Sequence, residues 1–406
     1  MKLNDKLLAQ MRAATRTLSG KGPQAATAAI HDALKILSPG GGAARSPAPQ
    51  QQPLMRDINP APGAASAGSV PPPTETPAEA ARSPMQDMND TLNAMLGKLQ
   101  NGKGLGDAFA GMKMPDFDLP GKRKAASNLP GKFIDASFTN GAGTRSYKLY
   151  IPSTHTGQPA PLVVMLHGCT QDPDDFATGT QMNELAEEMG CLVVYPAQSQ
   201  QANSSRCWNW FSAVDQKRGQ GEPSIIAGIT EAVMHEHAVQ RSEVYVAGLS
   251  AGGAMATIMG TLYPDLYAAV GVHSGLPFAA AHDLPSALAA MKGNFGRSTP
   301  SAKAIPIIVF HGDKDTTVHP ANGAELIKQG VHQVGKDIKV EPGRVPDGHA
   351  YTRTVHHRAD GAPHAEHWNI HGAGHAWSGG SANGSYTDGK GPDASREMMR
   401  FFQTKR

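Results

Sequence analysis

Cysteine is scarce in this chain of 406 residues, which contains only three. Cys169, Cys191 and Cys207 are too few to build the disulfide framework of a small secreted domain, and their spacings match no zinc-binding motif. Residues 97–104 come close to a phosphate-binding loop, but Gly104 stands where such a loop needs Ser or Thr to hold magnesium. We therefore predict no metal ion and no other cofactor.

Long hydrophobic runs are also missing. No stretch approaches the roughly 18 apolar residues that suggest a transmembrane helix, and residues 1–10 lack the apolar segment of a secretory signal. A net charge of +2, with both signs interspersed, gives no reason to expect nucleic acid or an anionic membrane surface as a partner. These absences predict a soluble cytoplasmic protein, although export by a non-standard route stays open.

Aromatic and β-branched residues are nearly absent from residues 38–84, which are rich in Pro, Ala and Gly. Such a segment cannot offset its ordering entropy by burial, so we predict a disordered linker. Residues 1–37 show the periodicity of two amphipathic helices, and residues 85–130 that of a short methionine-striped helix followed by a Gly-rich connector. We expect these helices to dock on the rest of the protein; self-association and binding to an apolar surface are the alternatives.

The second part of the chain, residues 131–406, has the pattern of one α/β domain. Segments 133–138 and 145–151 flank a Gly-rich turn and predict an antiparallel hairpin. Continuous apolar runs of the kind found in parallel strands buried on both faces follow, separated by helical patterns. These runs cover residues 162–166, 191–195, 244–247, 268–272 and 305–310. We predict a three-layer α/β sandwich whose mostly parallel sheet carries function at the carboxyl ends of its strands.

A Gly-x-Ser-x-Gly motif lies between the apolar run 244–247 and an Ala/Met-rich helical pattern. This strand-turn-helix context is the one that a nucleophile elbow requires. Gly248 and Gly252 leave the turn uncrowded, so that Ser250 can adopt a strained backbone conformation and expose its hydroxyl. Because a serine hydroxyl is a weak nucleophile, the hypothesis demands a histidine base and an orienting acid.

Two acidic residues and two histidines compete for those roles. Asp313 and Asp315 follow the run 305–310, and the spacing favours Asp315 as the orienting acid, with Asp313 forming the turn. His371 and His375 follow a predicted last strand, and we assign the base to His375 because its glycine neighbours give it freedom to reach Ser250. The order Ser250, Asp315, His375 is the one used by α/β-hydrolases.

An oxyanion forming at the substrate needs two fixed donors. In an α/β-hydrolase layout, one is the amide after the nucleophile and the other comes from the loop after an early strand. We assign these backbone roles to Ala251 and Cys169.

Taken together, these motifs resemble the polyhydroxybutyrate depolymerase-like esterases, a carbohydrate-esterase group that includes feruloyl and acetylxylan esterases. The resemblance runs from about residue 131 to the C-terminus. Its motifs are Leu-His-Gly-Cys-Thr-Gln at 166–171, Arg-Cys-Trp-Asn-Trp-Phe at 206–211, Gly-Glu-Pro at 221–223, Gly-Leu-Ser-Ala-Gly-Gly at 248–253, His-Gly-Asp-Lys-Asp at 311–315 and Gly-His-Ala-Trp-Ser-Gly-Gly at 374–380. It implies an α/β-hydrolase that cleaves carboxylic esters through an acyl-serine.

The same resemblance suggests further roles. Trp208, Trp210 and Trp377 are predicted to line an apolar substrate cleft, with a core position as the alternative for the first two. Cys169 and Cys207 flank motifs that meet in the family, so we predict that they form a disulfide, against the reducing compartment inferred above.

The most direct functional prediction is hydrolysis of polyhydroxybutyrate-type polyester or its oligomers. Feruloyl or acetylxylan esters of polysaccharide are the close alternative. A second alternative is a non-catalytic scaffold on a polymer granule surface, which the N-terminal helices of residues 1–37 would contact. Retention of Ser250, Asp315 and His375 argues against the scaffold.

Overall fold

The computed structural model describes residues 129–294, 305–331 and 337–405, which belong to one unit of the chain. The helices, linker and connector predicted for residues 1–130 lie outside the described residues, apart from the last two positions.

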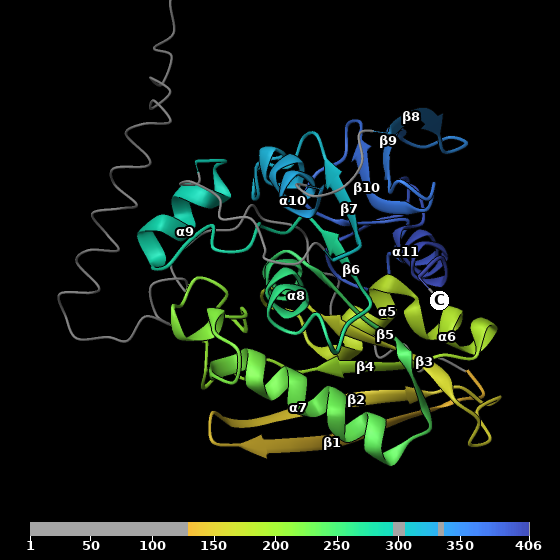
Figure 1. Ribbon diagram of the computed structural model, residues 1–406. Coiled ribbons are helices and arrows are strands. Elements are labelled where there is room, and N and C mark those ends of the chain that lie inside the picture. The colour runs from red at the N-terminus through yellow and green to blue at the C-terminus, as the bar shows by residue number, and fades with distance from the viewer. Residues whose placement is uncertain (1–128, 295–304, 332–336, 406) are drawn as a thin grey trace, which may run out of the picture. The chain divides into compact units, whose positions relative to one another are not determined.

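A mixed β-sheet forms the centre of the described unit (Figure 1). Among the described residues it has ten strands in the order β1-β2-β4-β3-β5-β6-β7-β10-β9-β8. The central six, β4 to β10 in that order, run parallel, whereas β1, β2 and the pair β9 and β8 add antiparallel edges. The strands are β1 (Lys132–Asn140), β2 (Gly143–Ile151), β3 (Ala160–Leu166), β4 (Leu192–Pro196), β5 (Val239–Leu249), β6 (Ala269–His273), β7 (Ile307–Gly312), β8 (Asp337–Arg344), β9 (Ala350–His357) and β10 (Pro363–Ile370).

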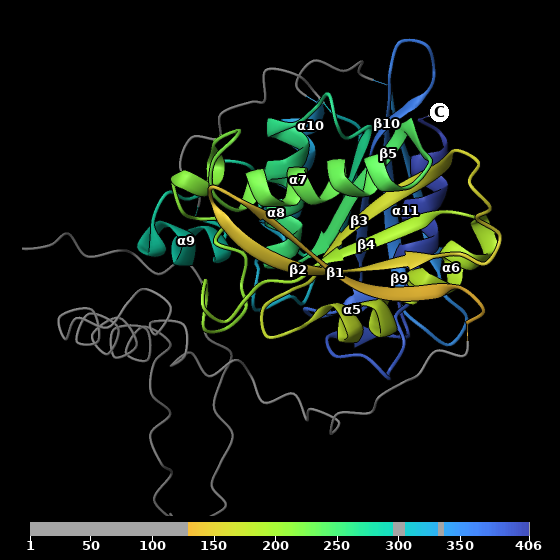
Figure 2. The ribbon, with the colours of Figure 1, turned by 90° about the horizontal axis from the view of Figure 1, so that it is seen from below.

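Helices cover both faces of this sheet, as the view along it shows (Figure 2). One face carries α7 (Gly221–Glu236), α8 (Ala251–Leu262) and α10 (Ala321–Val331), with α9 (Leu284–Met291) at its margin. The other carries α5 (Pro173–Thr180), α6 (Met182–Met189) and α11 (Ala394–Gln403). A short 3-10 helix (Val214–Gln216) and a two-stranded ribbon of β11 (Trp377–Ser378) and β12 (Thr387–Asp388) complete the elements. The predicted three-layer α/β arrangement is confirmed.

The continuous apolar runs are explained by this burial on both faces. In β3, Leu162, Val164 and Leu166 belong to the core under α7 and α8, whereas Val163 and Met165 belong to the core under α5, α6 and α11. Successive side chains of a strand point to opposite faces, so both sets must be apolar when both faces are covered.

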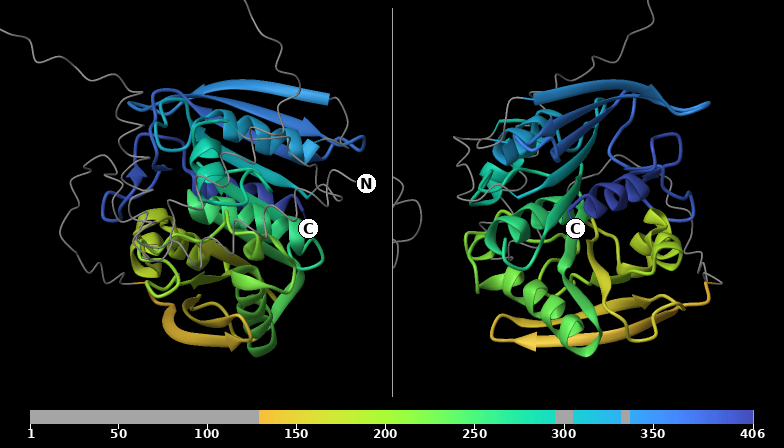
Figure 3. Two further views of the ribbon diagram at one scale, coloured as in Figure 1. Left: turned by 90° about the vertical axis from the view of Figure 1, so that its left-hand side faces the viewer. Right: turned by 45° about the vertical axis from the view of Figure 1, so that its right-hand side comes forward.

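The sheet edges differ most from the sequence-based expectation. The predicted hairpin is present as β1 and β2, which form one edge, but β8 and β9 at the other edge were not predicted (Figure 3). β8 has the sequence Asp-Ile-Lys-Val-Glu-Pro-Gly-Arg, and most of its side chains are exposed. Its charges and its proline mask the apolar signal of a strand, and both features are typical of edge strands.

Candidate active site

The turn between β5 and α8 consists of one residue, Ser250, which has φ 57° and ψ −119°. Its N–H donates to the carbonyl of His273 at the end of neighbouring β6 (2.9 Å), which holds this left-handed conformation. The glycines allow backbone to pack on backbone, because a Cβ at Gly252 would overlap the carbonyl oxygens of Leu166 and His167. The local geometry is that of the predicted nucleophile elbow.

His375 and Asp315 come together from two loops at the same end of the sheet. Nδ1 of His375 lies 2.7 Å from Oδ2 of Asp315. The other carboxylate oxygen, Oδ1, accepts hydrogen bonds from the amides of Thr317 (2.9 Å) and Val318 (2.8 Å). Both side chains are buried, so the carboxylate is fixed and the imidazole is oriented by it.

Burial would raise the pKa of Asp315, but contacts with His311 and His375 outweigh that effect and hold the pKa well below its usual range. The carboxyl is therefore ionised at neutral pH. This is the state in which an acid accepts a hydrogen bond from imidazole and stabilises the positive charge that develops on the ring.

A small cavity brings the serine and the histidine to a common space. Its lining consists of Gly168, Cys169, Gln171, Leu249, Ser250, His375 and Tyr386. The volume is about 10 Å³, which is the size of one water molecule. Tyr386, whose hydroxyl lies 3.1 Å from that of Thr170, was not predicted from the sequence; no motif marks it, and 216 residues separate it from its partner.

The backbone amides of Cys169, which lines this cavity, and of Ala251, which directly follows Ser250, have no hydrogen-bond acceptor within the described part of the chain. Ala251 is the first residue of α8, where the N–H groups lack intrahelical partners. Neighbouring amides are committed, since Gly168 donates to Oε1 of Gln171 (3.0 Å) and Thr170 donates to the carbonyl of Ser205 (2.7 Å). The amides predicted for an oxyanion are thus available to a substrate.

The predicted disulfide between Cys169 and Cys207 is present. It ties the loop after β3 to the loop that follows β4, across a sequence separation of 38 residues. A salt bridge between Arg206 and Asp172 (3.4 Å) adds a second connection between the same two loops.

The model of a protein family described as esterase PHB depolymerase matches residues 145–339. The poly(3-hydroxyalkanoate) depolymerase C of Paucimonas lemoignei is 35% identical over 256 residues, which cover 58% of this chain and 59% of that protein. This region of the chain belongs to the PHB depolymerase esterase family. The family match includes Ser250 and Asp315 and ends before His375.

Other proteins that this chain resembles are acetylxylan esterases by name. A probable acetylxylan esterase A of Aspergillus fumigatus is 30% identical over 210 residues, covering 47% of this chain and 55% of that protein. The chain thus spans 55 to 59% of the length of these two curated relatives. The solved structure of an acetyl xylan esterase from Aspergillus awamori aligns with 67% of this chain and 99% of the esterase chain. The TM-score is 0.51 and the sequence identity is 21%, so the two proteins are similar in fold.

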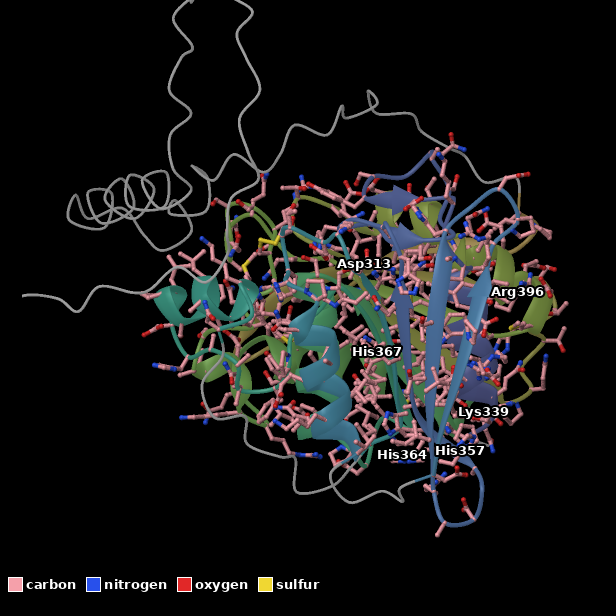
Figure 4. The ribbon with its side chains drawn as sticks, turned by 90° about the horizontal axis from the view of Figure 1, so that it is seen from above. Asp313, Lys339, His357, His364, His367 and Arg396 are labelled. Carbon is pink, nitrogen blue, oxygen red and sulfur yellow. A yellow bond between two sulfur atoms is a disulfide. The ribbon has the colours of Figure 1, made fainter. Side chains whose placement is uncertain are left out.

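The competing acid and histidine of this esterase region pair with each other. Oδ2 of Asp313 lies 3.2 Å from Nδ1 of His371, and Oδ1 accepts from the amide of Gly372 (2.8 Å). Nε2 of His371 lies 2.9 Å from the hydroxyl of Thr352, so neither ring nitrogen faces the cavity lined by Ser250. Figure 4 shows Asp313 at the end of the sheet away from His357 and His364. Asp313 was predicted to form the turn after β7; its carboxylate instead links that turn to the loop after β10.

The prediction that three tryptophans line the substrate cleft is wrong, whereas the alternative of a core position holds for Trp208 and Trp210. Trp208, Trp210 and Trp377 have exposed fractions of 0%, 6% and 1%, and none lines the cavity. Trp377 stacks on His273 with 5.3 Å between ring centroids, and Trp208 packs against a histidine at the end of β3. The rings support the strand ends behind the site and offer almost no surface to a substrate.

A buried carboxylate below the disulfide was also missed. Glu222 accepts hydrogen bonds from the backbone amide (2.7 Å) and the side-chain amide (2.8 Å) of Asn209, and also from Gln198. Gln198 donates in turn to the carbonyl of Cys207 (3.0 Å). Burial, followed by the charge of Asp215, raises the pKa of Glu222 to about 7. Glu222 stands in the Gly-Glu-Pro motif, which carried no assigned role.

No group of three or more His, Cys, Asp or Glu side chains arranged to hold a metal ion occurs within residues 129–294, 305–331 and 337–405. Over the same ranges, no helix combines the length and the apolar character needed to cross a bilayer.

Proposed function

We propose that the protein is a serine carboxylic-ester hydrolase. Ser250 is the nucleophile, His375 the general base and acid, and Asp315 the residue that orients the imidazole. The observation that carries this proposal is a cavity lined by both Ser250, in its strained turn, and His375. Nδ1 of His375 lies 2.7 Å from the buried carboxylate of Asp315.

In this mechanism, Oγ of Ser250 attacks the ester carbonyl carbon while its proton passes to Nε2 of His375. The tetrahedral oxyanion accepts hydrogen bonds from the amides of Cys169 and Ala251. Collapse breaks the bond to the alcohol oxygen, which takes the proton from His375 and leaves as the alcohol. Water then attacks the acyl-serine, again losing a proton to His375, and the acid departs as Ser250 recovers its proton.

The substrate that we propose is a polyhydroxybutyrate-type polyester or its oligomers. Support comes from the family match and from the 35% identity to a poly(3-hydroxyalkanoate) depolymerase. The 30% identity to a probable acetylxylan esterase keeps polysaccharide esters as the second candidate. Attachment to a polymer granule through residues 1–37 remains a prediction, because these residues lie outside the described part of the chain.

The test of the mechanism is Ser250→Ala, which should abolish hydrolysis of a p-nitrophenyl ester and labelling by an organophosphonate. Ser274→Ala is the matched control, because Ser274 also has a left-handed φ of 48° at a strand end but does not line the cavity. The control variant should keep stoichiometric labelling. Labelling that persists in the Ser250→Ala variant would assign the nucleophile to another serine.

The substrate is decided by product analysis of the unaltered chain on amorphous polyhydroxybutyrate, acetylated xylan and methyl ferulate in parallel. Release of 3-hydroxybutyrate or its oligomers at the highest kcat/KM supports the polyester proposal. Faster release of acetate or ferulate would replace it with the polysaccharide-ester alternative.

A further inference from the structure

A second histidine lies against the carboxylate of Asp315. Nε2 of His311 is 3.4 Å from Oδ2, the oxygen that also contacts Nδ1 of His375 at 2.7 Å. His311 has an exposed fraction of 1%, and the carboxylate itself is fully buried. One buried oxygen therefore faces two imidazole rings, one on β7 and the other on the loop after β10.

The ring of His311 has a defined orientation. Its Nε2 lies 2.8 Å from the carbonyl oxygen of Val318, which can only accept, so Nε2 carries the proton. The amide of the same Val318 donates to Oδ1 of Asp315 at 2.8 Å. The backbone of Val318 thus contacts the carboxylate through its N–H and His311 through its C=O, and these contacts tie the turn carrying Asp315 to β7.

The opposite edge of the ring is blocked. Nδ1 of His311 is buried and has no hydrogen-bond partner in the described ranges. It faces Gly323 of α10, where an added Cβ would lie 3.0 Å from it and 3.0 Å from Nε2 of His367 on β10. Figure 4 shows His367 beside α10. Because backbone occupies the space on this side, the ring cannot turn away from Asp315.

The titratable side chains that face this group are His375, His367 and His273 on β6. Burial, followed by the proximity of His311, lowers the pKa of His367 to about 4. Burial, followed by the proximity of His311 and His375, lowers the pKa of His273 to about 3. Both rings are neutral at the working pH of an esterase, so neither supplies a charge that competes with the contact between His311 and Asp315.

We propose that His311 is a positioning residue for the candidate triad: its Nε2–H group, which donates to the Val318 carbonyl and lies 3.4 Å from Oδ2 of Asp315, holds the Asp315 turn and tunes the charge that the carboxylate presents to His375. This inference rests on the proposed function, in which His375 is the base. The positive end of the N–H dipole lies near Oδ2 and offsets part of the field of its negative charge. Without it, that charge acts more strongly on His375, stabilises the imidazolium and raises its proton affinity.

Two substitutions separate the donor from the rest of the ring. His311→Asn keeps a polar group near the position of Nδ1 and has no atom at the position of Nε2, whereas His311→Gln places an amide N–H near Nε2. His367→Asn is the matched control, because Nε2 of His367 is buried and also faces Gly323, but His367 is not among the hydrogen-bond or ion-pair partners of Asp315 in the described ranges. His311→Leu repeats the loss of the donor without any polar group, in case the asparagine variant fails to fold.

The measurement is the pKa of His375 by NMR of the ring protons in the full chain, together with the acid limb of the pH profile of kcat/KM. His311→Asn should raise the pKa of His375 by roughly half to one pH unit, a three- to tenfold gain in proton affinity. His311→Gln should restore most of the original value, and His367→Asn should leave it unchanged.

An unchanged pKa of His375 in a folded His311→Asn or His311→Leu protein would overturn the inference, as would an equal shift in the His367→Asn control. The NMR readout does not depend on catalysis. A pKa that shifts while the acid limb of kcat/KM stays in place would therefore support the role of His311 and refute His375 as the base.

Discussion

Removal of the disulfide between Cys169 and Cys207 should cost stability mainly by enlarging the unfolded ensemble. The bond closes a loop with a sequence separation of 38 residues, for which the chain-entropy model gives about 4 kcal/mol at 25 °C. Domains are usually stable by about 5–15 kcal/mol, so the loss is a large fraction of the total. The perturbation is the double substitution Cys169→Ser and Cys207→Ser.

Catalysis should suffer far less than stability. In the folded state, the loop after β3 keeps the hydrogen bond from Thr170 to Ser205 (2.7 Å) and the salt bridge between Arg206 and Asp172 (3.4 Å). The proposed donor at position 169 is a backbone amide, which serine also possesses. We expect kcat on a soluble ester at 25 °C to fall less than about tenfold, because one lost oxyanion donor costs on the order of a hundredfold or more.

Urea unfolding followed by tryptophan fluorescence measures the free energy, with Cys191→Ala as the control for loss of a buried cysteine outside the bond. Alkylation of the unreduced, denatured wild type should modify one thiol. The entropic reasoning fails if the double variant loses under about 1 kcal/mol relative to wild type, or if three thiols react. A hundredfold fall in kcat would show that the disulfide, and not the polar contacts, holds the amide in place.

Two further predictions concern carboxyl groups. Asp315→Asn should reduce kcat on a soluble ester on the order of 10³–10⁴-fold, because His375 loses the acceptor that orients it. Asp313→Asn should keep kcat within about tenfold of the wild type. If the two variants rank in the reverse order, the orienting role belongs to Asp313. Because the pKa of Glu222 is raised in the folded state, that state binds more protons than the unfolded state between about pH 4.5 and 7. The free energy of unfolding should therefore fall as pH rises through this window, by up to about 3 kcal/mol. Glu222→Gln should flatten that part of the urea-midpoint profile, and parallel profiles for the two proteins would contradict the assignment.

The sequence was most informative where local pattern and burial agree. The parallel strands were predictable because a strand covered on both faces must be apolar along its length, as β3 is. The elbow was predictable because the turn at Ser250 needs Gly248 and Gly252, where a side chain would overlap neighbouring backbone atoms. The expected antiparallel hairpin, the disulfide and the pairing of Asp315 with His375 are present in the structure.

What the sequence did not reveal depends on contacts between distant segments. Tyr386 reaches the cavity only because the ribbon of β11 and β12 folds back toward Thr170. The tryptophans looked like cleft residues by their chemistry, but Trp208 and Trp377 are almost wholly enclosed by packing that no local pattern reports. β8 was missed because an exposed edge strand carries little apolar periodicity.

The proposed reacting groups lie on separate loops, and three buried histidines at strand ends hold those loops in place. After β3, Nε2 of His167 accepts from the amide of Gln198 (3.1 Å). At the end of β6, Nε2 of His273 accepts from the amide of Ser378 (3.0 Å), three residues beyond the proposed base. Burial lowers the pKa of His167 to about 4 and that of His273 to about 3, which keeps both rings neutral and able to accept. At β7, His311 donates instead. Imidazole suits this work because one ring offers a donor and an acceptor on opposite sides, so it can link a strand to a loop where no water enters.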